Sequence, residues 1–98
     1  MTDELALNKA AERGARAARL LEDDLLKEAF ETLDRDYTKA WRETAARDTD
    51  ARERLWQATQ VLGKVRDHLL AVANNGKLAQ RELDALQDKR TRRSFFSG

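Results

Sequence analysis

The chain has no cysteine, no proline and only four glycines among its 98 residues. The absence of cysteine excludes disulfides, thiolate nucleophiles and thiolate metal ligands, and it fits a reducing compartment. The absence of proline means that no residue removes a backbone N–H from within a helix. β-Branched residues are limited to three valines and a handful of threonines, so no segment predicts a strand.

Long apolar runs and a targeting segment are missing too. The N-terminal segment MTDELALNKA carries acids where a signal peptide would carry positive charge. No apolar run approaches the roughly 18 to 20 residues that a membrane span needs. We therefore expect a soluble, cytoplasmic protein that does not contact a membrane.

What the chain does contain is charge and strong helix formers. Charged residues make up 38% of it, and Ala, Leu, Glu, Lys, Arg and Gln dominate long stretches, which predicts an all-α fold in one small domain over residues 1–88. The net charge of +1 argues against a generally basic nucleic-acid binder. Charge is nevertheless uneven, because residues 23–46 sum to −3 and residues 76–98 to +3.

Two helical stripes predict an antiparallel hairpin of helices at about 24–46 and 51–74. Apolar positions recur at spacings of three and four before and after the segment ARDTDARE, where Asp50 and Glu53 predict a helix N-terminus. In an antiparallel hairpin the residue numbers of two facing residues add up to a constant, and here that sum is 98 or 99 for every pair of apolar positions, which predicts one register. The six pairs are Thr44 with Leu55, Ala40 with Ala58, Tyr37 with Leu62, Leu33 with Val65, Phe30 with Leu69, and Leu26 with Val72.

Two further helices flank this hairpin. Small residues centred on Gly14 form a stripe in a first helix at about 3–22, and Asp23 or Asp24 is expected to cap the helix that follows. The segment Asn74, Asn75 and Gly76 predicts a helix end and a last helix at about 77–90, because Gly is the usual residue after a C-terminus. We call the stripe of apolar positions between the two hairpin helices the seam. Apolar residues continue the seam's spacing through this segment, which favours a continuous helix instead.

No arrangement of residues predicts catalysis, and we expect neither an enzyme nor a bound metal or cofactor. His68 is the one histidine and has no second ligand at helical spacing. The acids Asp23 and Asp24 suit a helix N-terminus better than acid–base chemistry.

The hairpin's flank predicts a protein interface. Trp41 and Trp56 lie one position off the seam, and Trp56, Gly63 and Leu70 repeat at seven residues. A mid-helix Gly63 costs about 0.8 to 1 kcal/mol, which is understandable where another helix packs closely. That helix is either the first helix of the same chain or part of another copy.

Residues 89–98 predict a basic tail that binds a partner. It combines four cations with two phenylalanines that gain nothing in water: Lys89, Arg90, Arg92, Arg93, Phe95 and Phe96. The cations alone would also suit the end of a helix, because they complement its dipole. Four charges are too few for tight duplex binding by one copy, although stacking on single strands and multivalency both remain open.

The segments LLEDDLLKEAFETLDRDYTKAWRE, ARERLWQATQVLGKVRDHLL and NNGKLAQREL resemble small all-helical proteins of tailed-phage and prophage gene clusters. The hairpin looks like the oligomerisation core of small terminase subunits, which assemble into rings during DNA packaging. The helix-turn-helix usual in that family is not recognisable in residues 1–22, so no functional residue is carried over.

Three functions follow from these features. The first is a homo-oligomeric, non-enzymatic component of phage DNA packaging or of the virion, whose tail binds a larger protein of the same assembly. The second is a phage-encoded adaptor or inhibitor of a host protein. The third is a small helical nucleic-acid-binding protein that uses its tail.

Overall fold

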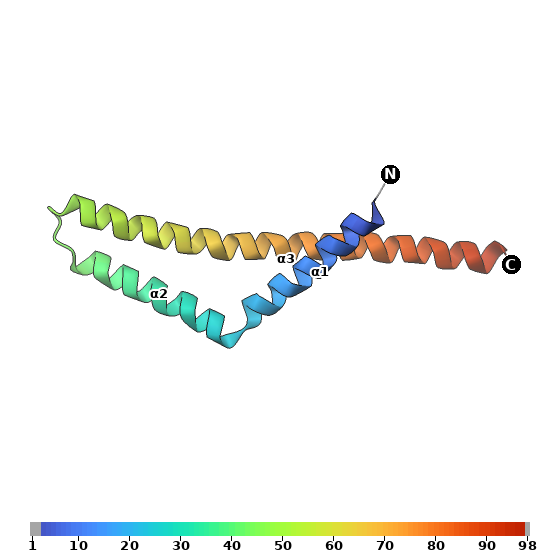
Figure 1. The fold of residues 1–98 in the computed structure, drawn as a ribbon, viewed down its shortest axis with the longest axis horizontal. Coiled ribbons are helices and arrows are strands. Elements are labelled where there is room, and N and C mark those ends of the chain that lie inside the picture. Colours follow the sequence, from blue (N-terminus) through green and yellow to red (C-terminus); the bar gives the residue numbers. More distant parts are fainter. Residues whose placement is uncertain (1–2, 98) are drawn as a thin grey trace. The chain divides into compact units, whose positions relative to one another are not determined.

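The computed structural model describes the backbone of residues 3–97 and the side chains of residues 3–93, and within these the protein is all-α. Three helices follow one another: α1 (Glu4–Glu22), α2 (Asp24–Glu43) and α3 (Thr49–Ser97) (Figure 1). No described residue lies in a strand. The all-α fold predicted from composition is confirmed.

The boundary between α1 and α2 is set by Asp23. This residue has an extended backbone, with φ −66° and ψ 123°, and its side chain accepts a hydrogen bond of 3.0 Å from the backbone N–H of Leu26. An aspartate at this position satisfies a donor that the first turn of the helix leaves free, and its charge suits the positive end of the dipole. The predicted break at Asp23 is confirmed.

The turn between α2 and α3 differs in detail from the prediction. Helix α2 ends at Glu43, three residues early, because Thr44 has an extended backbone. The carboxylate of Asp48 accepts a hydrogen bond of 3.3 Å from the backbone N–H of Ala51, and α3 begins at Thr49. Asp48 therefore takes the capping role that Asp50 was predicted to have.

The helices form two units. Residues 20–69 form the hairpin unit, and residues 1–19 with 70–98 form the crossing unit. In the hairpin unit α2 runs antiparallel to the first part of α3, as Figure 1 shows. Arg66 lies over the ring of Phe30, and Arg52 lies over that of Trp41, so both arginines of α3 reach aromatic residues of α2 across the hairpin.

In the crossing unit, α1 packs on α3 through two glycines. A Cβ atom built on Gly14 would lie 2.4 Å from the Cα of Gly76, and one built on Gly76 would lie equally close to the Cα of Gly14. Both glycines are buried, as are Ala17, Ala73 and Ala79. Small residues thus let two backbones approach to a distance that no side chain would permit.

The predicted helix end at Asn74, Asn75 and Gly76 is wrong, because α3 runs without interruption from Thr49 to Ser97. Gly76 does not adopt a positive φ, so it does not act as a helix cap. Its hydrogen atom in place of a side chain instead leaves room for the backbone of α1. The residues predicted as a separate helix at 77–90 and as a tail at 89–98 accordingly continue α3 as far as Ser97.

Candidate functional site

In the hairpin unit two arginines of α3 stack on aromatic rings of α2. The guanidinium carbon of Arg52 lies 4.2 Å from the ring centre of Trp41, and that of Arg66 lies 5.1 Å from the ring centre of Phe30. Arg52 also donates hydrogen bonds to the backbone carbonyls of Trp41 and Thr44, at 3.3 and 3.2 Å. Cations so placed are attracted by the ring faces and cover them from water. Arg52 thus covers part of the Trp41 ring, whose side chain is still 37% exposed, and its predicted interface role stays a prediction.

Aliphatic side chains of the same hairpin are exposed on both of its helices. Leu33 and Val65, which share one layer of the seam, are 40% and 48% exposed, and Val61, one turn from Val65, is 59% exposed. Phe30 alone among residues 20–69, all of which are described, is classed as buried. We call Leu33, Val61 and Val65 the open face. It presents aliphatic side chains from two helices side by side.

The predicted flank along α3 is exposed as well. Trp56 and Leu70 are exposed side chains, and a Cβ atom on Gly63 would meet no atom within 4 Å. Within the crossing unit, α1 meets Gly76, a glycine that was predicted to end a helix.

Replacing Gly63 by alanine is expected to stabilise the protein by about 0.8 to 1 kcal/mol. The new methyl group has open space, and alanine loses less backbone freedom than glycine when a helix forms. Urea unfolding followed by circular dichroism measures the change. A loss of stability instead would show that another molecule packs against Gly63 in solution.

The basic segment after residue 88 is part of a helix rather than a free arm. The guanidinium of Arg90 donates to the carboxylate of Glu4 in an ion pair within the crossing unit. Lys89, Arg92 and Arg93 are exposed. The backbone of Phe95 and Phe96 continues α3, but their side chains lie outside the described residues, so their predicted role stays a prediction.

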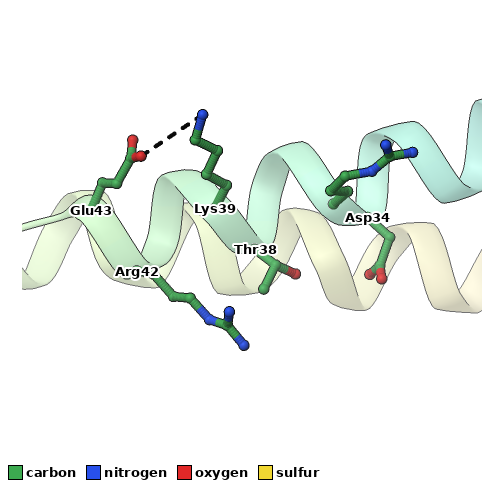
Figure 2. Close-up of a pocket in the computed structure, with 6 residues that line it drawn as sticks. Asp34, Thr38, Lys39, Arg42 and Glu43 are labelled. Atoms are coloured by element: carbon green, nitrogen blue, oxygen red, sulfur yellow. Dashed lines mark ion pairs between the residues drawn. The ribbon is translucent and has the colours of Figure 1, made fainter.

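A polar depression lies on α2. It is lined by Asp34, Arg35, Thr38, Lys39, Arg42 and Glu43. Figure 2 shows Lys39 and Glu43 directed the same way, with the amine 4.0 Å from the carboxylate, and both side chains are largely exposed. Since one helix supplies every lining residue and the charges are mixed, the depression does not enclose a ligand.

Chemistry-bearing residues are not gathered elsewhere in the described part of the chain. His68 is exposed on α3, and the described residues hold no group of three or more His, Asp or Glu that could bind a metal ion. No helix among them has the length and apolar character to span a membrane. The exposed apolar surface of the hairpin unit is therefore the candidate functional site.

Comparison of the chain with models of protein families, with curated proteins and with solved structures finds no match.

Proposed function

We propose that this protein is a non-enzymatic helical protein that works by self-association, as a component of a larger assembly. The observation that carries the proposal is the apolar surface that the hairpin unit leaves exposed. Leu33, Val61 and Val65 are 40%, 59% and 48% exposed. Exposed apolar side chains gathered in one place usually mark a contact with another protein.

The thin core of the hairpin unit supports the same proposal. Two helices can bury only a narrow stripe between them, and here that stripe encloses Phe30 alone. Small helical domains with so little buried area usually gain stability from oligomerisation, a metal or disulfides. The chain has no cysteine for a disulfide, so association is the route that its own residues favour.

Phage DNA packaging or virion assembly is the setting that we propose on the resemblance of the hairpin to small terminase subunits. A larger protein of that assembly is then the proposed partner of residues 89–98. The exposed cations Lys89 and Arg92 support this assignment of the segment.

Light scattering over a wide range of protein concentrations tests self-association. We expect a mass that is a whole-number multiple of 11.2 kDa and that falls only on dilution. A mass of one chain at every concentration would contradict the proposal. It would favour the alternative of an adaptor that presents its exposed apolar face to a different protein.

A further inference from the structure

The hairpin unit exposes a group of aliphatic side chains that points to a specific partner. Leu33, Val61 and Val65 are 40%, 59% and 48% exposed, whereas the rings of Phe30 and Trp41 carry the guanidinium groups of Arg66 and Arg52. We infer that two copies of the chain join their open faces into an antiparallel four-helix bundle, in which α2 of each copy lies on the hairpin part of α3 of the other. This inference rests on the proposed self-association and assigns its surface and geometry.

The register of the hairpin determines what would meet in such a pair. Within one chain, position n of α2 lies level with position 98 − n of α3, as for Leu33 and Val65. A half-turn about an axis parallel to the helices places α2 of the second copy on α3 of the first at these same levels. Leu33 of each copy then meets Val65 of the other, and four aliphatic side chains fill one central layer.

Charges at the rim of the open face are complementary in this arrangement. Asp36 and Glu43 follow Leu33 at three and ten residues, so they lie on its side of α2. Arg54 precedes Val61 by seven residues and Lys64 follows it by three, so both lie on its side of α3. All four side chains are exposed in the single chain, and the carboxylate of Glu43 also lies 4.0 Å from the amine of Lys39 on its own helix.

The symmetric pairing brings each acid of one copy to a base of the other. Glu43 lies level with position 55 and therefore beside Arg54 of the second copy. Asp36 lies level with position 62, about 3 Å along the axis from Lys64 of the second copy. Opposite charges around an apolar centre favour this register and disfavour shifted ones. The acidic rim of α2 and the basic rim of α3 are thus matched to a second copy of this chain.

The surface around Trp56 lacks these properties. Trp56 is 56% exposed and Trp41, on the other helix, is 37% exposed, but the Trp41 ring carries the guanidinium of Arg52, so this surface is partly cationic. The open face combines two helices, an aliphatic centre and rims of opposite sign, as the sides of a helical bundle require. Self-association through Trp56 is therefore the competing outcome of the test.

Charge exchange between two variants tests the bundle. One variant carries Asp36→Lys and Glu43→Lys, and the other carries Arg54→Glu and Lys64→Glu. Each alone places like charges at every rim contact, so we expect its mass by light scattering to fall by half or more. Mixed in equal amounts, the variants place opposite charges at every contact, and the wild-type mass should return as a one-to-one pair. Circular dichroism confirms that each variant is helical.

Matched substitutions separate the open face from the rest of the surface. Val61→Lys should abolish association, whereas Leu78→Lys should not, although the two side chains are 59% and 57% exposed. Arg42→Glu with Asp67→Lys, which change charge away from the open face, should leave the mass unchanged.

The outcomes distinguish this inference from the proposed function. A wild-type protein that is monomeric throughout contradicts both. An associating wild type whose mass survives Val61→Lys but falls with Trp56→Ala overturns the open face and leaves self-association standing. If each charge variant alone loses mass but their mixture does not regain the wild-type mass, the proposed register is wrong.

Discussion

Replacing Gly76 by alanine is expected to cost the crossing unit about 3 kcal/mol, at the upper end of what overpacking costs. The added Cβ would lie 2.4 Å from the Cα of Gly14 and 3.0 Å from the carbonyl oxygen of Ala10. Both neighbours are backbone atoms of a helix, which cannot rotate away as a side chain can. Alanine favours the helix by about 0.8 to 1 kcal/mol, which is too little to offset the separation of α1 from α3.

Thermal unfolding followed by circular dichroism measures this effect. For a domain of this size we expect a fall in Tm of more than about 10 °C. Gly14→Ala should give a similar fall, and the double variant should be little worse than either single one, because both substitutions separate the same two backbones. Gly63→Ala is the matched control, since it makes the same chemical change on the same helix in open space and should raise stability. Equal behaviour of Gly63→Ala and Gly76→Ala would show that α1 does not approach α3 at Gly76.

Replacing Phe30 by alanine should cost the hairpin unit about 3 to 5 kcal/mol. Phe30 is 7% exposed, and its ring both fills the space between α2 and α3 and carries the guanidinium of Arg66. No other side chain of residues 20–69 is buried to this degree, so none can take over its role. Leu62→Ala, at a half-buried seam position, is expected near the lower end of the roughly 2 to 5 kcal/mol range for buried leucines.

Urea unfolding and amide hydrogen exchange of α2 report on this loss. Leu25→Ala provides the control, because its side chain is exposed on the same helix and such changes usually alter stability by less than about 0.5 kcal/mol. A Phe30→Ala protein as stable as the Leu25→Ala protein would mean that α2 does not pack on α3 through this ring.

Helix content and the hairpin were predictable because both depend on local spacing. Apolar residues at intervals of three and four define a helix face, and the constant sum of opposite positions leaves one antiparallel register. Asp23 was predictable as a cap for the same reason, since an N-cap acts on a residue three positions away. Asp48, Thr49 and Asp50 can each cap a helix, and in the structure Asp48 does so. Which of the three takes this role depends on where the chain leaves α2.

The stacked arginines were not found from the sequence. Arg52 and Arg66 are two among many arginines and lysines, and their long side chains can reach a ring or remain in water. The register places Arg66 level with position 32, near Phe30, but Arg52 level with position 46, five residues beyond Trp41.

The roles of the glycines were decided by tertiary structure alone. A glycine at a helical position can end the helix, admit another backbone or merely weaken the helix, and its lack of a side chain leaves no periodic pattern to distinguish these roles. Gly76 lies inside α3 and contacts the backbone of α1 at Gly14. A Cβ atom on Gly63 would have no neighbour within 4 Å. The sequence by itself thus determined that the described residues are almost all helical and that α2 folds back on α3. Where α1 makes its contact depended on the fit between two backbones, since Gly14 and Gly76 can approach closely only once the helices are packed.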